Sequence, residues 1–358
     1  MNKTVKKVLK GIAFLFAVLI SLVVLFFAVL TITEFRPKDQ ENVTIENAVQ
    51  QKVEKGDSLT IVTWNIGYGG LDETEDFFMD GGTSKKSASK EMVENNLSDI
   101  AEQIETMNPD ILMLQEVDRN STRTHYYNEK AFLDEKLSHY ENSFSNNYKS
   151  LWVPYPIPML GKVDSGIATY SKYGESEAVR VSLPCPFSYP VRLCNLKRCL
   201  MVNRIPVEGT QKELVIVNLH LEAYDSGEGK EKQTKMLFEF MEADEEKGNY
   251  VIAGGDFNQT FAGVDTTKFP TISEEYWQPG MIEVDELSDR FTFFMDENTA
   301  SCRSLDKVLK GADKENFQYY VIDGFIVSNN VRIEEVKAVD LSFKSSDHNP
   351  LRMKVTLE

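Results

Sequence analysis

Residues 11–33 of this 358-residue chain, GIAFLFAVLISLVVLFFAVLTIT, contain no charged side chain. A helix of roughly 20 apolar residues can cross the hydrocarbon core of a bilayer, whereas the apolar core of a signal peptide has only about 7–15 residues. No A-x-A-like cleavage site closes the segment. We therefore expect an uncleaved transmembrane signal anchor. A cleaved signal peptide and a buried core helix are the alternatives.

The charges on either side of this segment predict its orientation. Lys3, Lys6, Lys7 and Lys10 precede it, while acidic residues dilute the basic ones that follow. Positively charged flanks tend to remain in the cytoplasm. We expect a single-pass protein of the cell membrane, with residues 1–10 in the cytoplasm and everything after residue 33 outside the cell.

The rest of the chain divides into a linker and one domain. Residues 34–57 are polar, charged and poor in large apolar side chains, which is typical of a flexible linker. Residues 58–358 are long enough for one large α/β domain. The formal net charge of −17 disfavours long-range attraction to nucleic acid, although a cation-binding site would itself be acidic. Nothing in the sequence predicts a protein partner.

Three of the four cysteines lie close together, at Cys185, Cys194 and Cys199, and the fourth is Cys302. Outside the cell, a disulfide can form within residues 185–199, but three cysteines leave the pairing open. The equal alternative is that the cysteines are small buried hydrophobic residues.

Within residues 58–358, short apolar runs alternate with helical patterns. Apolar residues recur at helical spacing between Val93 and Ile104, and again between Met236 and Met241. The predicted strands are SLTIVTWNIG, DILMLQEV, ELVIVNLHLEAY, YVIAGGDFN and QYYVIDGFIVS. This alternation predicts a layered α/β fold.

These strands carry polar residues that do not suit a buried core. On a strand, residues i and i+2 project from the same face, so Asp256 and Asn258 would lie side by side. The strand-associated set is Asn65, Glu116, His220, Asp256, Asn258 and Asp323, and Asp347 and His348 precede the last strand. A buried carboxylate without a partner is costly. A divalent cation shared among the carboxylates, with a histidine paired to the remaining aspartate, would explain the whole set.

Each residue alone has a simpler interpretation. A single Asn or Glu at a strand end is more often a turn or a cap than a ligand. The face that carries Asn218, His220 and Glu222 can also be the solvated side of a sheet. Asp323 is harder to dismiss because it lies within the apolar run VIDGFIV. It requires a partner, and His348 is a good candidate.

Six segments taken together resemble the endonuclease/exonuclease/phosphatase family, which includes pancreatic deoxyribonuclease, apurinic endonucleases, bacterial neutral sphingomyelinases and inositol-phosphate 5-phosphatases. They are TWNIG, LQEVD, NLHLEAY, GGDFN, IDGFIVS and SSDHNP, in the family's order. Each segment alone is a weak match, but six in order are specific. The resemblance implies an α/β four-layered sandwich of two packed mixed β-sheets flanked by helices, with one active site at the rim where strands end.

The resemblance also implies a metal site. Glu116 matches the family's principal metal-binding glutamate, Asn65 lies beside it, and Asp347 matches an aspartate at or near the metal. Oxygen ligands select a hard cation, so Mg²⁺ is expected, with Mn²⁺ as a substitute.

The remaining residues match the catalytic groups of the family. His348 and Asp323 match its histidine–carboxylate pair. Asp256 and Asn258 match residues around the nucleophilic water and the scissile phosphate, and His220 matches a histidine of the deoxyribonuclease and sphingomyelinase branches. The base that activates the water is His348 or Asp256.

The expected function is that of a membrane-anchored, extracytoplasmic, Mg²⁺-dependent hydrolase of phosphodiester bonds. A membrane tether and an acidic domain favour phospholipid headgroups as the phosphoester substrate. A surface nuclease that cleaves DNA or RNA is the alternative, although no basic patch with interleaved aromatic residues is present. A non-catalytic surface binding module is a further alternative, against which the complete acidic set argues.

Two stretches are expected near the substrate. Residues 69–91 read as an insertion, in which Phe77, Phe78 and Met79 either contact membrane or substrate or pack locally. Residues 151–166 combine aromatic residues and prolines and are expected to border the substrate cleft.

Overall fold

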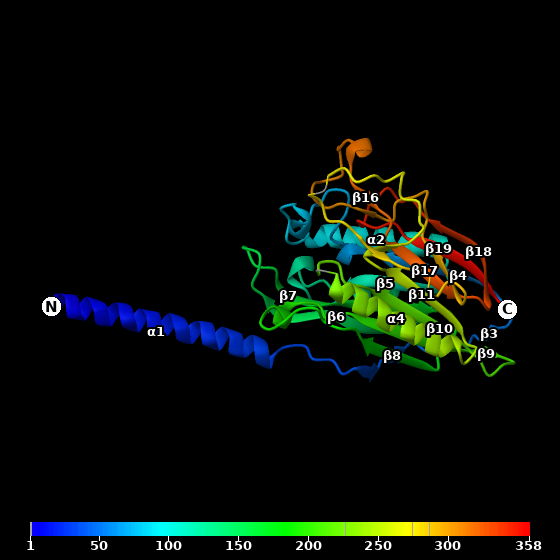
Figure 1. Cartoon of the computed structure of the whole chain (residues 1–358), viewed down its shortest axis with the longest axis horizontal. Helices are drawn as coiled ribbons and strands as arrows, with labels where there is room; N and C mark the ends of the chain where they lie inside the picture. Colours follow the sequence, from blue (N-terminus) through cyan, green and yellow to red (C-terminus); the bar gives the residue numbers. More distant parts are fainter. Residues whose placement is uncertain (1, 226, 274, 286) are drawn as a thin grey trace.

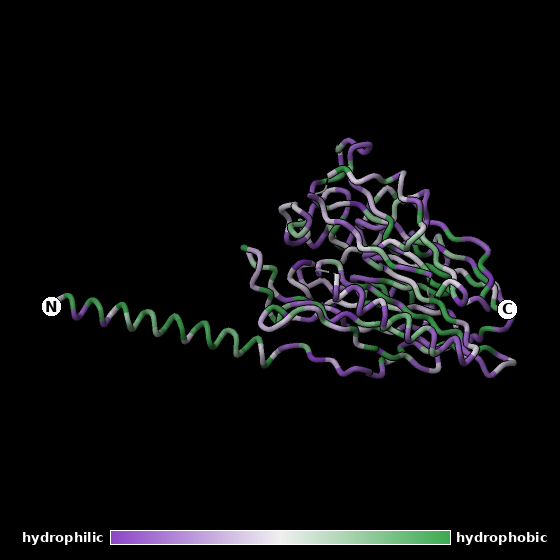
Figure 2. The backbone as a smooth tube through the Cα atoms, in the orientation of Figure 1, coloured by the Kyte–Doolittle hydropathy of each residue, from purple (hydrophilic) through white to green (hydrophobic). Residues whose placement is uncertain are grey.

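A long helix, α1 (Lys3–Ile32), extends away from a layered α/β body in the computed structural model, which describes residues 2–225, 227–273, 275–285 and 287–358 (Figure 1). The helix is mostly apolar, with hydrophilic residues near its N-terminal end (Figure 2). It is long and apolar enough to cross a membrane, and none of its most apolar stretch is buried in the body. The interpretation of residues 11–33 as a buried core helix is therefore wrong.

Two mixed sheets form the body. The first runs in the order β1 (Gln40–Asn42), β8 (Glu177–Ser182), β9 (Cys199–Glu208), β10 (Glu213–His220), β11 (Tyr250–Asp256), β17 (Asp323–Ser328) and β14 (Phe291–Phe294), with β3 (Val53–Glu54) also beside β9. The second runs in the order β18 (Val331–Ala338), β19 (Leu351–Leu357), β4 (Ser58–Asn65), β5 (Ile111–Asp118), β7 (Gly161–Ser171), β6 (Glu141–Val153) and β2 (Ile45–Glu46). Two short ribbons pair β12 (Gln259–Phe261) with β13 (Gly280–Ile282) and β15 (Cys302–Arg303) with β16 (Tyr319–Tyr320).

Helices cover the outer faces of both sheets. The α-helices of the body are α2 (Lys90–Met107), α3 (Glu129–Lys136) and α4 (Glu228–Glu245). The short 3₁₀ helices are η1 (Gly67–Gly69), η2 (Phe78–Asp80), η3 (Thr122–Thr124), η4 (Val191–Cys194) and η5 (Lys314–Asn316). One core cluster joins α2 and α3 to the second sheet, and another joins α4 to the first. The predicted four-layered α/β sandwich is confirmed.

Local sequence explains these elements. The Ser89 side chain accepts a hydrogen bond from the Met92 N–H and caps the start of α2, and Asn108, with φ 45°, ends that helix in the left-handed region. Along β10 the side chains alternate, so that Ile216 packs between the sheets while Val215 packs toward α4.

The topology brings distant strand ends to one rim. β4 runs parallel to β5, and β10 runs parallel to β11, so within each pair the carboxyl ends lie together. β17 is antiparallel to β11 and begins with Asp323 opposite Asp256. β19 is antiparallel to β4, so the residues that precede β19 lie at the end of β4. The rim therefore collects strand ends from β4, β5, β10 and β11 and strand beginnings from β17 and β19.

Two details differ from the sequence expectations, and a third bears on alternatives that the sequence left open. Residues 34–57 do not form a free tether, since β1, β2 and β3 pair with β8, β6 and β9 of the two sheets. The segment QYYVIDGFIVS forms β16 and β17 rather than one strand, because β16 pairs away with β15. The four cysteines are free, and Cys199 and Cys302 are buried.

Candidate active site

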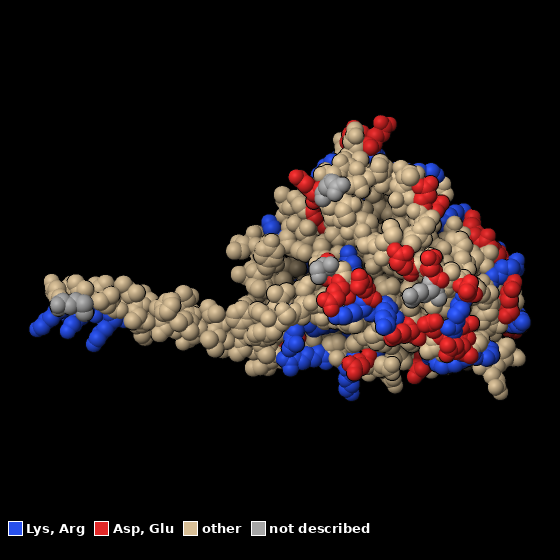
Figure 3. Space-filling model, viewed as in Figure 1, with Lys and Arg blue, Asp and Glu red and all other residues tan. Residues whose placement is uncertain are grey.

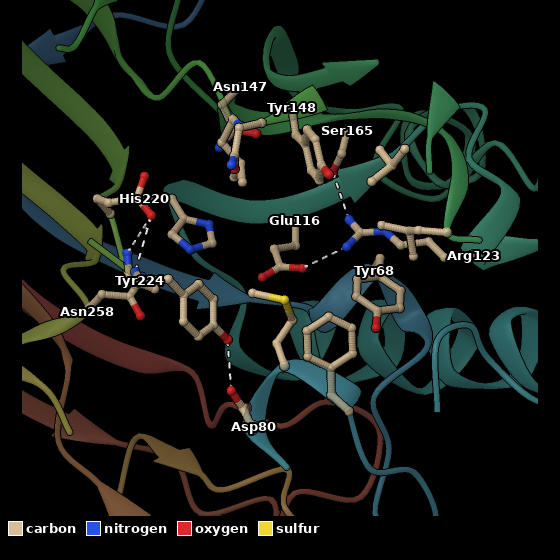
Figure 4. Close-up of a pocket in the computed structure, with 18 of the residues that line it drawn as sticks. Tyr68, Asp80, Glu116, Arg123, Asn147, Tyr148, Ser165, His220, Tyr224 and Asn258 are labelled. Carbon is tan, nitrogen blue, oxygen red and sulfur yellow. Dashed lines mark hydrogen bonds and ion pairs between the residues drawn. The ribbon is translucent and has the colours of Figure 1, made fainter. Parts of the chain in front are cut away.

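One cavity of 630 Å³ lies at the rim of strand ends (Figure 4). Seven of the eight site residues predicted from the sequence line it: Asn65, Glu116, His220, Asp256, Asn258, Asp347 and His348. The eighth, Asp323, is buried and bonded to His348. We call these eight residues the rim site.

Glu116 has an unusual backbone. Its φ is 56°, and the pairing of β5 with β7 shifts register between Leu114 and Val117. A bulge of this kind redirects a side chain at the cost of local strain, which is common at functional sites. The Glu116 carboxylate lies in the cavity (Figure 4).

The other candidate metal ligands lie close to Glu116. Asn65 Nδ2 is 3.4 Å from Glu116 Oε1 and donates to Asp256 Oδ2 at 3.0 Å, while Asn65 Oδ1 accepts from the Gly67 N–H. A Cβ on Gly67, whose φ is 51°, would stand 2.5 Å from Asp347 Oδ1. Only glycine therefore fits at position 67, the first residue of η1, beside Asp347.

The charges of this group suit a cation. Burial raises the pKa of Asp347, and the nearby Glu116 carboxylate raises it further despite the opposing effect of His348. The buried Asp347 carboxylate and the partly exposed Glu116 carboxylate repel each other, and a hard divalent cation would relieve that repulsion. The oxygen donors of Glu116 and Asp347 thus fit Mg²⁺ or Mn²⁺, whereas Asn65 turns its amide nitrogen toward Glu116 and its oxygen toward the Gly67 N–H.

His348 forms a buried dyad with Asp323. His348 Nδ1 lies 2.8 Å from Asp323 Oδ2, and His348 Nε2 lies 3.7 Å from Asp256 Oδ2. Burial lowers the pKa of His348, but Asp323, Cys302 and Asp347 together outweigh burial, so the net pKa is well above the ordinary value. Burial raises the pKa of Asp256 to about 7, even though His348 opposes this. The arrangement sets a cationic imidazole beside a carboxylate that can take up a proton near neutral pH.

His220 and Asn258 complete the rim site. Burial, together with the positive charges of Arg198 and His348, lowers the pKa of His220 well below its ordinary value, so this imidazole is neutral. Its Nε2 lies 3.4 Å from Asp256 Oδ2. The Asn258 backbone N–H donates to Asp256 Oδ1 at 2.9 Å, and Asn258 has a φ of 51°.

Three arginines line the cavity, Arg123, Arg198 and Arg303, and none was predicted from the sequence. Arg123 binds Asp118 at 2.9 Å, lies 3.6 Å from Glu116 and stacks over Tyr68, with 3.7 Å to the ring centroid. Arg198 is 3.9 Å from Glu222, and its Nε and Nη1 are buried without a hydrogen-bond partner among the described residues. An unpartnered buried guanidinium is costly, which makes Arg198 a candidate for contact with an anion.

The sequence profile of the Endonuclease/Exonuclease/phosphatase family matches residues 62–348. The chain belongs to this family, as the six sequence segments indicated. A search of curated proteins found no match.

Solved structures share the fold at low sequence identity. An endonuclease/exonuclease/phosphatase from Beutenbergia cavernae is 18% identical with a TM-score of 0.56, covering 84% of this chain and 72% of that one. The human Nocturnin catalytic domain with bound sulfate anion is 15% identical with a TM-score of 0.51, covering 88% of this chain and 97% of that one. A family protein from Leptotrichia buccalis is 17% identical with a TM-score of 0.52, covering 84% and 100%. The hydrolase class that acts on phosphoester bonds follows from the family.

Proposed function

We propose that this chain is a membrane-anchored, extracytoplasmic, Mg²⁺-dependent phosphodiesterase that acts on phospholipid headgroups. The observation that carries the proposal is the meeting of Glu116, Asp347 and the His348–Asp323 dyad in one cavity. In this proposal residues 1–10 lie in the cytoplasm, residues 11–33 cross the membrane, and residues 58–358 form the catalytic domain outside the cell.

Glu116 and Asp347 would hold the cation, and Asn65 would keep Glu116 and Asp256 in position through its amide. When bound, Mg²⁺ neutralises the charge of the phosphodiester and of the transition state. Another set of donor atoms, from Asp256, Asp323 and His348, also lies within 4.8 Å of one another. A cation there would displace the 2.8 Å contact between His348 and Asp323, so we place it at Glu116 instead.

Asp256 and His348 would have different roles in the proton transfers. Asp256, with a pKa near neutrality, takes the proton of the attacking water. His348 remains protonated because Asp323 stabilises the imidazolium, and its Nε2–H binds the phosphoryl oxygen as negative charge develops. This division favours Asp256 over His348 as the base.

The other cavity residues would hold the substrate. His220 is neutral and lines the cavity, so its ring would hydrogen-bond the phosphoryl or leaving-group oxygen. Arg198 lines the same cavity, and a guanidinium binds phosphate oxygens well.

A product screen tests the function. The full chain in nanodiscs would be incubated with Mg²⁺ and, separately, phospholipids, plasmid DNA, RNA and inositol phosphates, and the products identified by mass spectrometry. We expect headgroup release that EDTA abolishes and that falls at least about a thousandfold in Glu116→Ala and in His348→Ala. Cleavage of DNA or RNA without lipid turnover would instead establish the nuclease alternative. Activity unchanged in both variants would overturn the site assignment.

A further inference from the structure

The cavity of the rim site extends to the long N-terminal helix. Phe26, Phe27 and Leu30 of α1 line the same cavity as Glu116 and His348. Leu30 is buried, although α1 is otherwise exposed over most of its length. The body is hollowed beside the root of this helix, whose basic residues gather at the opposite end (Figure 3). The helix is therefore a wall of the cavity as well as an extension from the domain.

The root of α1 is held against the body by specific contacts. The buried carboxylate of Glu34 pairs with Arg192 at 3.3 Å and with Lys197 at 3.5 Å. Thr31 Oγ1 lies 3.5 Å from the Tyr189 hydroxyl. β1 begins at Gln40, so few residues separate the helix from the sheet. These contacts fix the helix relative to the cavity.

The position of Phe26 and Phe27 along α1 determines how deep this part of the cavity wall would lie in a membrane. Phe26 and Phe27 precede the end of the helix at Ile32 by about 8–9 Å, at 1.5 Å per residue. Charged residues begin only at Glu34. If α1 spans a bilayer, this part of the cavity wall lies within the outer leaflet, below the charged layer formed by Glu34, Arg36, Arg192 and Lys197.

The tip of the β6–β7 hairpin and the predicted insertion, residues 69–91, add further apolar residues to the lining of the cavity. The end of β6 and the loop that follows it expose Trp152, Tyr155 and Ile157, the last with 85% of its surface accessible. Phe78 of η2 contacts Tyr155 edge to face, with ring centroids 5.9 Å apart, and both line the cavity. Exposed apolar residues grouped in this way mark a binding surface, and Trp and Tyr favour the membrane interface. We call Phe26, Phe27, Leu30, Phe78 and Tyr155 the apolar wall.

We propose that the apolar wall binds the hydrocarbon part of an amphiphilic phosphodiester, which enters laterally from the outer leaflet while its phosphate reaches the rim site. This inference rests on the proposed phosphodiesterase function and adds a binding site for the lipid tail, formed in part by the protein's own membrane helix. A lipid is favoured over nucleic acid, because the basic side chains that line the cavity, Arg123, Arg198 and Arg303, are buried rather than arranged along an open groove.

A series of substrates with one headgroup separates the tail site from the chemistry. The full chain in nanodiscs would be assayed with methyl, butyl, octyl and dodecyl p-nitrophenyl phosphate, each below its critical micelle concentration. Because each buried methylene favours binding, we expect kcat/KM to rise at least about 100-fold from methyl to dodecyl. The double variant Phe26→Ser/Phe27→Ser should reduce the dodecyl-to-methyl ratio at least about 10-fold.

The matched control is Phe14→Ser/Phe16→Ser, which makes the same change on exposed residues of α1 away from the body. It should keep the wild-type ratio. Equal ratios in both double variants, or no rise with chain length while the methyl ester is still cleaved, would overturn the tail site and leave the proposed function standing. Failure to cleave even the methyl ester with Mg²⁺ would overturn the proposed function itself.

A second measurement does not depend on turnover. A phosphatidylcholine with a diazirine on its acyl chain would be photolysed in nanodiscs that hold the inactive Glu116→Gln chain. We expect cross-links to residues 26–30 and to residues 152–157, located by peptide mass spectrometry. Cross-links confined to α1, without residues 152–157, would contradict the proposal, because the whole membrane segment of α1 would meet lipid in any orientation of the domain.

Discussion

The rim site and the apolar wall belong to one cavity but are built in different ways. Rim-site residues lie at strand ends, where the register of two sheets fixes them, and seven of the eight are among the buried polar residues. The apolar wall comes from a helix end, a 3₁₀ turn and a hairpin tip that lie far apart in the sequence. The difference teaches that reaction chemistry and substrate choice can change separately in this fold.

Among variants that keep Glu116 and His348, the largest expected effect lies in the rim site, at the positioning residue Asp323. Asp323→Asn removes the carboxylate that raises the pKa of His348, so this pKa should fall toward or below its ordinary value of 6.5. The imidazolium is then lost as pH rises through that range. We expect kcat to fall about 100-fold at pH 8 and less at pH 6, for methyl and dodecyl esters alike.

The pH profile of kcat between pH 5.5 and 9 is the measurement for Asp323→Asn. Asp265→Asn, on an exposed loop, is the matched control and should retain the wild-type profile. A uniform loss at all pH values would indicate a structural role for Asp323 rather than control of His348.

A smaller effect is expected at Arg198, which faces the substrate phosphate in this proposal. Arg198→Gln keeps a donor but loses the charge, so kcat/KM should fall roughly 10-fold for every ester of the series and the inhibition constant of inorganic phosphate should rise by a similar factor. Arg332→Gln, an exposed arginine, is the control. An unchanged inhibition constant for phosphate would remove Arg198 from the site.

The smallest effect is expected outside both regions, at Glu175. Burial raises the pKa of Glu175 to about 8, although a hydrogen bond from Asn203 opposes the rise. Between pH 4.5 and about 8 the unfolded chain loses this proton while the folded chain keeps it, so stability falls as pH rises, by at most about 1.4 kcal/mol per pH unit.

Glu175→Gln should therefore raise the free energy of unfolding at pH 8 by about 1–2 kcal/mol and leave it nearly unchanged at pH 4. Urea unfolding at the two pH values measures this change. Neither the methyl nor the dodecyl ester should be cleaved at an altered rate, which gives a baseline for the other variants. A variant that is less stable at pH 8 would show that Glu175 is ionised in the folded protein.

The rim site was largely predictable because its signals are local. Each apolar run ends in or carries a polar residue at a fixed offset, and the parallel pairs β4–β5 and β10–β11 follow from the alternation of strands and helices. The two sheets and the family followed from the same segments. The roles of the individual residues remain predictions.

What the sequence did not reveal depends on distant contacts. Arg198 follows Lys197 and looks like part of a charged surface, yet the fold buries it beside Glu222. The bulge at Glu116 arises from pairing with β7, and the short strands of residues 40–54 form only because two completed sheets offer their edges. That α1 lines the cavity could not be predicted from its apolar sequence, since hydropathy does not show which side of a helix contacts the domain.

Seven residues, 33–39, connect α1 to β1. Even fully extended they reach only about 24 Å. With α1 in a bilayer and a lipid as the substrate, as proposed, the domain stays at the membrane surface and meets its substrate by diffusion in two dimensions. Turnover should then follow the mole fraction of substrate in the leaflet and be insensitive to dilution of the whole suspension.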